Sequence, residues 1–375
     1  MLHIAPPDQL PERKEINMSA AAANASETMM ALVHDGKGGI SLQDRPFPHI
    51  EHPQDAIVRV TMSSICTSDL HIMHGSVPRA LPDTVLGHEF VGVVEEVGAD
   101  VRGFDPGDRV AVNVETFCGS CFFCERGYVN NCVEGGWELG CRIDGCQAEY
   151  VRVPLANQGL THIPDAVSDK EALLLGDVLA TGVFGAELAE IKPGDTVAVI
   201  GAGPVGQCAM LCARNYGPAN IIAIDIDADR LSMARSHGAC DACANPTVED
   251  VEKAVLAATC GRGADAVIEC AGGANTFEMA WKIARPNAVV SLMALYEEDQ
   301  VLPLPLMYGK NLVFKTGGVD AHGLDRTMNL IAAGKLDTSY LMTHSFPLNR
   351  IEEAYRFFAA HEDGCMKVAI TPYER

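Results

Sequence analysis

Six residues with side chains suited to metal binding or proton transfer are concentrated between residues 64 and 92. They are Cys66, Ser68, Asp69, His71, His88 and Glu89. A thiolate and an imidazole are ligand types that zinc prefers, and hydroxyl, carboxylate and imidazole groups can pass protons. A single cysteine is more often just a small buried hydrophobic residue. The combination therefore predicts a metal site with proton-transfer groups if the rest of the chain supports one.

Four further cysteines are clustered in a glycine-rich segment, residues 117–146. They are Cys118, Cys121, Cys124 and Cys132, with two, two and seven residues between them. Four thiolates at this spacing predict a closed tetrahedral zinc site, which stabilises its lobe and does no chemistry because no coordination position stays open. An iron–sulfur cluster also uses four cysteines and is the alternative.

A glycine-rich motif over residues 201–206 directly follows the apolar run TVAVI and opens a predicted helix. Its defining residues are Gly201, Gly203, Pro204, Val205 and Gly206. Such glycines permit a tight turn and close approach of a pyrophosphate, which then lies at the helix N-terminus. The alternative is a purely structural turn between a strand and a helix.

Asp225 follows Gly206 by 19 residues and comes at the end of the next apolar run, IIAIDID. A carboxylate there can accept hydrogen bonds from both adenosine ribose hydroxyls and would repel a 2′-phosphate, so the sequence predicts NAD rather than NADP. Arg230 is the residue that most weakens this preference. It could cover the ribose, or it could lie on a solvated helix face.

Two stretches of different character must position these motifs. From Met29, short β-branched runs separated by glycine and proline predict a β-rich, barrel-like domain. From about residue 169, apolar runs alternate with helical patterns, which predicts a parallel sheet covered by helices on both faces. Helical patterns over LDRTMNLIAAG and IEEAYRFFAA and a closing strand, MKVAITP, are expected to return to the first domain.

Composition excludes several classes of partner. The formal net charge of −22 repels phosphate backbones and anionic lipid, so we expect neither nucleic-acid nor membrane partners. No apolar run reaches the roughly 18 residues of a membrane span. The 14 cysteines are not spaced like a disulfide scaffold, which indicates a reducing, cytoplasmic location. Residues 1–28 lack a secretory signal and are predicted to be a disordered N-terminal extension.

The segment GHEFVGVVEEVG, the four-cysteine lobe and GAGPVG followed by Asp225 together resemble the zinc-containing medium-chain alcohol dehydrogenases, from about residue 29 to the C-terminus. The resemblance implies an α/β protein with two domains. A GroES-like β-rich catalytic domain (29–180 and 325–375, with the zinc lobe at 117–146) would pack against a Rossmann doubly wound parallel-sheet domain (181–324). It also implies a homo-oligomer, with a tetramer favoured over a dimer.

The resemblance further implies roles for individual residues. Cys66 and His88 match ligands of a catalytic zinc, and Glu89, which follows the ligand histidine as it does in the family, is assigned to the same metal site. Asp69 matches the carboxylate that orients this histidine, although it could instead cap a helix. Ser68 takes the position of the hydroxyl that hands on the alcohol proton, with a turn residue as the alternative, and His71 that of the outer base.

The third zinc ligand distinguishes branches of the family. Asp177 matches it where the horse-liver type has cysteine, as in bacterial secondary-alcohol dehydrogenases and the formaldehyde dehydrogenase and dismutase group. Asp177 could instead cap the following helix. Trp137 falls where the secondary-alcohol enzymes place a pocket-lining tryptophan, or it could belong to the core of the lobe. Some of those enzymes prefer NADP and lack the four-cysteine lobe, so the match to them is partial.

The implied function is a zinc-dependent oxidoreductase that transfers hydride between NAD and a small secondary or primary alcohol and its carbonyl, with two zinc ions per chain. Polyols, amino alcohols and formaldehyde are alternative substrates within the family. A non-catalytic nucleotide-binding protein is the alternative from another class. It predicts loss of the zinc ligands, and Cys66, His88 and Asp177 are all present.

Overall fold

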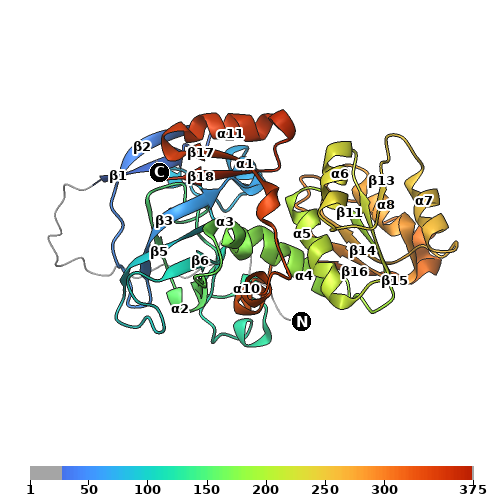
Figure 1. Ribbon diagram of the computed structural model, residues 1–375, viewed down its shortest axis with the longest axis horizontal. Helices are drawn as coiled ribbons and strands as arrows, with labels where there is room; N and C mark the ends of the chain where they lie inside the picture. The colour runs from blue at the N-terminus through green and yellow to red at the C-terminus, as the bar shows by residue number, and fades with distance from the viewer. Residues whose placement is uncertain (1–27, 374–375) are drawn as a thin grey trace.

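The computed structural model describes residues 28–373, which form two lobes side by side along the long axis of the molecule (Figure 1). Of the predicted disordered extension over residues 1–28, residues 1–27 lie outside the described residues, and Thr28 begins β1. Within the described part of the chain, no helix is both long and apolar enough to cross a bilayer.

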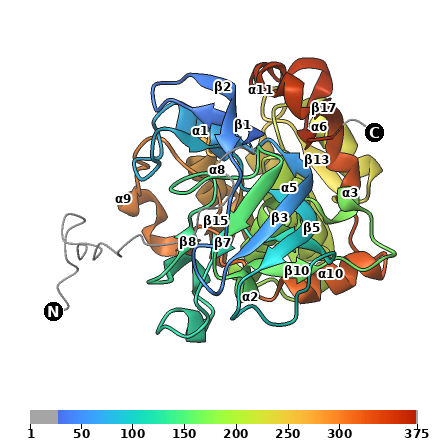
Figure 2. The ribbon, with the colours of Figure 1, turned by 90° about the vertical axis from the view of Figure 1, so that its left-hand side faces the viewer.

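The first lobe is built on a seven-stranded, largely antiparallel sheet in the order β10-β6-β5-β3-β18-β17, with β9 also paired to β3. Figure 2, which faces this lobe, shows β3 and β5 side by side. A three-stranded sheet, β2-β1-β4, and the pair β7-β8 complete it. The strands are β1 Thr28–His34, β2 Ile40–Pro46, β3 Ala56–Ser64, β4 Thr84–Val85, β5 Phe90–Val97, β6 Arg109–Val112, β7 Glu115–Thr116, β8 Gly136–Trp137, β9 Tyr150–Val153, β10 Leu160–His162, β17 Met342–Pro347 and β18 Lys367–Thr371.

The C-terminal tail returns to this first lobe, as predicted. Strand β18 pairs antiparallel with β3, Ala369 opposite Ser64, and parallel with β17. Helix α11 covers the tail strands, while α10 packs near β10 and α3 (Figure 1). The helices of this lobe are α1 Thr67–Met73, α2 Ala156–Gly159, α3 Asp169–Ala172, α10 Leu324–Ala332 and α11 Ile351–Ala360.

The second lobe is a six-stranded, wholly parallel sheet in the order β13-β12-β11-β14-β15-β16. Its strands are β11 Thr196–Ile200, β12 Asn220–Ile224, β13 Ala242–Ala244, β14 Ala264–Glu269, β15 Ala284–Leu292 and β16 Val313–Thr316. Its helices are α4 Ala180–Leu188, α5 Pro204–Ala213, α6 Ala228–Ser236, α7 Val251–Ala258, α8 Thr276–Ile283 and α9 Leu304–Met307.

Alternate residues of β11 enter two different apolar cores, one on each face of the parallel sheet. Val197 and Val199 pack with residues of α4 and α5, whereas Ala198 and Ile200 pack with residues of α7 and α8. Because both faces are covered, the strand is apolar along its whole length rather than alternating. This confirms the predicted α/β class. The first of these cores also includes residues of the other lobe, among them Val91, so the two lobes share one apolar contact region.

Candidate active site and metal centres

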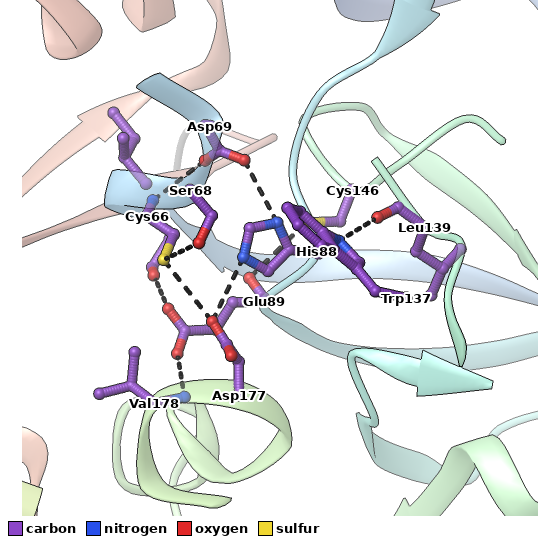
Figure 3. A network of polar contacts seen from close by, with 12 residues as sticks. Cys66, Ser68, Asp69, His88, Glu89, Trp137, Leu139, Cys146, Asp177 and Val178 are labelled. Atoms are coloured by element: carbon purple, nitrogen blue, oxygen red, sulfur yellow. Dashed lines mark hydrogen bonds and ion pairs between the residues drawn. The ribbon is translucent and has the colours of Figure 1, made fainter. Parts of the chain in front are cut away.

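Three residues from separate segments of the chain come together in the structure. Cys66 precedes α1, His88 follows β4, and Asp177 lies in a single π-helical turn, Leu175–Leu179. Their ligand atoms all lie within 4.8 Å of one another. Asp177 Oδ2 is 3.6 Å from Cys66 Sγ and 3.2 Å from His88 Nε2 (Figure 3). The structure therefore brings the predicted ligand set together.

The wide turn that presents Asp177 depends on a close backbone contact. A Cβ atom at Gly176 would lie 1.8 Å from the carbonyl oxygen of Val112, so only glycine lets this turn pack against β6. Single π-helical turns are frequent at functional sites. The alternative that Asp177 caps the following helix does not hold, because Leu179 is the N-cap of α4 and the carboxylate faces Cys66 and His88.

Asp69 is fully buried and has two roles. Its Oδ2 accepts hydrogen bonds from the backbone N–H of Cys66, at 3.0 Å, and from the hydroxyl of Tyr355, at 3.1 Å. Its Oδ1 lies 3.2 Å from Nδ1 of His88. The capping interaction and the orienting interaction are thus compatible. A carboxylate this close to Nδ1 favours a proton on that nitrogen, and Nε2 faces Asp177.

The electrostatics of this pocket favour positive charge. Burial alone would lower the pKa of His88, but the carboxylates of Asp69 and Asp177 raise that pKa well above its usual range. A thiol, an imidazole and a carboxylate so close together fit a zinc ion, with a fourth position open to a substrate or water. Without a cation, ionised Cys66 and Asp177 would repel each other.

Glu89 was placed with the metal residues by the sequence, but its carboxylate is engaged elsewhere. It lies 2.5 Å from Nζ of Lys367, accepts a hydrogen bond from Ser64 Oγ and faces the backbone N–H of Val178 at 3.3 Å. It is not among the three clustered ligands. Burial would lower the pKa of Lys367, but Glu89 beside it holds that pKa above its usual value.

Sequence reasoning missed Lys367 and Tyr355. Both come from the C-terminal tail and are buried, Tyr355 against Asp69 and Lys367 against Glu89. Lys367 Nζ also donates to the carbonyl oxygen of Ile65, at 2.9 Å. A lysine within the apolar strand KVAIT was the only available signal, since a buried lysine needs a partner of opposite charge. Tyr355 gave no signal, because a tyrosine on an amphipathic helix is ordinary core.

The two predicted proton-transfer residues both lie on α1, and their polar atoms have different neighbours. Ser68 Oγ is 3.7 Å from Cys66 Sγ, beside the ligand cluster. His71 points to the other lobe, where its Nδ1 lies 2.9 Å from Oε1 of Glu297. No hydrogen bond joins Ser68 to His71 within residues 28–373, so a relay between them needs an intervening group.

The glycine-rich motif joins β11 to α5, as the sequence predicts. A Cβ atom at Gly206 would lie 1.8 Å from the carbonyl oxygen of Gly201, so the loop can close only around glycine. Gly203 is the N-cap of α5, Pro204 is its first residue and Val205 packs against the apolar core. The free N–H groups of the first helical turn are therefore available to an anionic group such as pyrophosphate.

Asp225 lies against this loop. Its Oδ2 accepts the N–H of Ala202 at 2.6 Å, and its Oδ1 accepts the N–H of Asp227 at 2.9 Å. Arg230 Nε lies 3.6 Å from Asp227, and its Nη1 would be 3.8 Å from a Cβ atom at Gly203. Both residues that bear on the choice between NAD and NADP therefore lie at the mouth of the loop.

The four clustered cysteines bring their sulfur atoms within 4.8 Å of one another. Cys124 Sγ is 4.0 Å from Cys118 Sγ and 3.4 Å from Cys121 Sγ. Backbone N–H groups of Cys118 and Glu134 donate to the sulfur of Cys132 at 3.3 and 3.4 Å. Four converging sulfur atoms with N–H donors around them fit a closed zinc site.

Trp137 lies beside the ligand cluster. Its ring centroid is 5.4 Å from that of His88, in an edge arrangement, and its Nε1 donates to the carbonyl oxygen of Leu139 (Figure 3). The small apolar core of the cysteine lobe does not include Trp137. Glu115, directly opposite the half-buried Trp137 in the β7–β8 pair, is buried, and burial raises its pKa to about 8.

Comparisons with known proteins agree with this geometry. Residues 52–165 match the model of the alcohol dehydrogenase GroES-like domain, and residues 204–322 match that of the zinc-binding dehydrogenase domain. An alcohol dehydrogenase from Cupriavidus necator is 38% identical over 92% of this chain and 99% of its own length. An NADP-dependent isopropanol dehydrogenase from Thermoanaerobacter brockii is 35% identical over 87% of this chain and 94% of its own.

A solved zinc-dependent alcohol dehydrogenase from Streptococcus pneumonia superimposes with a TM-score of 0.87 and 36% identity, covering 92% of this chain and 99% of the other. Fold and site define a two-domain dehydrogenase with a GroES-like domain and a Rossmann domain. The chain belongs to the zinc-containing medium-chain alcohol dehydrogenase family, which confirms the resemblance drawn from its motifs.

Proposed function

We propose that this protein is an NAD-dependent dehydrogenase that interconverts small secondary or primary alcohols and their carbonyl compounds at a zinc held by Cys66, His88 and Asp177. The main support is the convergence of these three side chains, whose ligand atoms lie within 4.8 Å of one another. A zinc ion there would act as a Lewis acid that makes an alcohol easier to deprotonate. The nicotinamide of a bound cofactor would accept the hydride.

In this proposal the protein's own groups orient the metal ligands and move the proton. Asp69 keeps the proton of His88 on Nδ1, so that Nε2 remains a ligand. Ser68, next to Cys66, receives the alcohol proton and passes it on. His71, with 19% of its side chain exposed, delivers it to solvent. General acid–base assistance of this kind contributes about 10²–10⁴-fold to rate.

We propose NAD as the cofactor because Asp225 places a carboxylate at the mouth of the glycine-rich loop. A negative charge there opposes a 2′-phosphate and favours the free ribose hydroxyls. The relative from Thermoanaerobacter brockii is NADP-dependent, so the preference must be measured on this chain.

The experiment that tests the proposal is a substrate screen with NAD and NADP in parallel, following the absorbance of the reduced nicotinamide. We expect turnover with small secondary or primary alcohols and NAD. Polyols, amino alcohols and formaldehyde belong in the same panel. Absence of turnover with every alcohol and both cofactors would refute the proposal.

We propose a second, structural zinc at the four cysteines. Replacing Cys121 by serine is expected to lower zinc content from about two ions per chain to about one and to lower Tm by at least about 4 °C, because zinc binding and folding are coupled. Elemental analysis and thermal unfolding measure both effects. Cys260→Ser, at an exposed cysteine outside the cluster, is the control and should change neither. Unchanged zinc content in Cys121→Ser would contradict the assignment.

We further propose that the protein acts in the cytoplasm as a homo-oligomer, a tetramer in preference to a dimer, with small molecules as its other partners. The support for an oligomer is that, within residues 28–373, β16 is an edge strand paired with β15, and that an exposed apolar segment precedes it in the sequence. In that segment Leu306 and Tyr308 are 75% and 85% exposed. An open edge strand and exposed apolar residues are features that a second copy of the chain can cover. Light scattering on the full chain measures the state directly.

A further inference from the structure

We infer that Glu297 is a positioning residue for the outer end of the proton relay: reaching from the dinucleotide-binding lobe, its carboxylate holds the ring of His71 across the boundary between the two lobes. This inference rests on the proposed function, because it concerns how His71 releases the alcohol proton. Sequence reasoning gave no signal for Glu297, which follows β15 in the acidic run YEEDQ and is exposed.

The contact involves the end of α1 at two points. Glu297 Oε1 lies 2.9 Å from His71 Nδ1 and accepts a hydrogen bond from Ser76 Oγ at 3.3 Å. Ser76 is itself tied to the helix, since its backbone N–H donates to the carbonyl oxygen of His71 at 2.9 Å. One carboxylate oxygen therefore fixes both the catalytic-domain histidine and the turn that follows it.

Tyr296, the residue before Glu297, anchors this segment to the parallel sheet of the second lobe. The hydroxyl of Tyr296 donates to Glu269 Oε2 at 2.7 Å. Glu269 is fully buried at the carboxyl end of β14, and its other oxygen accepts the N–H groups of Ala271 and Gly272 at 2.8 and 2.9 Å. Ligands of such sheets bind outside the carboxyl ends of the strands. Glu297 is therefore presented from the edge where the cofactor is expected.

The chemical consequence is control of the histidine tautomer. When Nδ1–H donates to Glu297, the lone pair of Nε2 is left free to receive a proton. As Nε2 takes the proton, the imidazolium is paired with the carboxylate. The proton then passes from His71 to water, so Glu297 ends unchanged. The pair is too exposed to add much stability, since 19% of the His71 side chain and 56% of the Glu297 side chain are accessible. The pair instead fixes the orientation of the His71 ring.

The test is a double-mutant cycle on alcohol oxidation with NAD, with Glu297→Ala, His71→Ala and the double variant. We expect Glu297→Ala to lower kcat about three- to tenfold, a fraction of the full general-base contribution, with KM for alcohol and NAD unchanged. In the His71→Ala background the same change should have no effect, because the two residues act as one unit. Glu297→Gln, which keeps an acceptor oxygen, should recover part of the loss.

Glu298→Ala is the matched control, because Glu298 is the adjacent exposed carboxylate and its side chain is not bonded to His71; it should leave kcat unchanged. An equal loss in both backgrounds, or an unchanged kcat in Glu297→Ala, overturns the inference. If the wild-type protein oxidises alcohols and His71→Ala is slow, either of these two results refutes the role of Glu297 and leaves the proposed function intact. A wild-type protein that oxidises no alcohol removes the proposed function as well.

Discussion

Asp177→Ala is expected to abolish alcohol oxidation, lowering kcat/KM by about 10³-fold or more. The carboxylate is one of three clustered ligands, and it lies 3.2 Å from Nε2 of His88. A catalytic metal contributes several kcal/mol of transition-state stabilisation, and each 1.36 kcal/mol is tenfold in rate. Elemental analysis should show a loss of about one zinc per chain, while the zinc of the cysteine lobe is retained.

Asp177→Cys is the control that separates lost coordination from a disturbed fold. A thiolate is a good zinc ligand, so this variant should keep about two zinc ions per chain and recover part of the activity. Asp177→Ala is also expected to remain folded, as judged by circular dichroism, because the side chain does not cap α4. Full activity and full zinc content in Asp177→Ala would show that the cluster is not the catalytic metal site.

Asp225→Ala is expected to lower the ratio of kcat/KM for NAD over kcat/KM for NADP by about 10²-fold. NAD loses the hydrogen bond between its ribose hydroxyls and the charged carboxylate, worth about 1.5–3 kcal/mol. NADP is no longer opposed by the repulsion between that carboxylate and its 2′-phosphate. Steady-state kinetics with both cofactors measures the ratio. A wild-type preference for NADP would contradict the assignment at the outset.

Asp225 also supports the loop, so its charge must be separated from its structural role. Its carboxylate accepts the N–H groups of Ala202 and Asp227. Asp225→Asn retains an acceptor oxygen for one of them but removes the negative charge, and it should weaken the discrimination against NADP with a smaller loss of stability. Arg230→Ala tests the opposing influence: in the Asp225→Ala background it should lower the use of NADP, since a guanidinium near a phosphate favours it.

The features that could be predicted from sequence are local. Cys118 and Cys132 are only 14 positions apart, and residues 201–206 form one turn. Residues so close in sequence are also close in space in most conformations of the chain. The alternation of apolar runs and helical patterns predicted the parallel sheet for a similar reason, because a fully apolar run such as TVAVI is stable only where both faces are covered. Resemblance to a family supplied Asp177, which no local pattern identified.

Distant partners could not be predicted, because they depend on how separate segments pack. Glu89 follows His88 directly, yet successive residues along an extended chain point in opposite directions, and its carboxylate faces Lys367 rather than the ligand cluster. Likewise, Asp69 accepts a hydrogen bond from Tyr355 of the C-terminal tail, and His71 is paired with Glu297 of the other lobe.

The sequence by itself determined the two-domain α/β class, the glycine-rich loop, the cysteine lobe and the types of side chain available for chemistry. Each of these follows from composition and short spacing. The tertiary structure alone decided that Glu89 faces Lys367 rather than the ligand cluster, that Tyr355 contacts Asp69 and that Glu297 holds His71. The physical reason is that a carboxylate has the same chemistry everywhere in the chain, and only packing sets its neighbours, its burial and therefore its role.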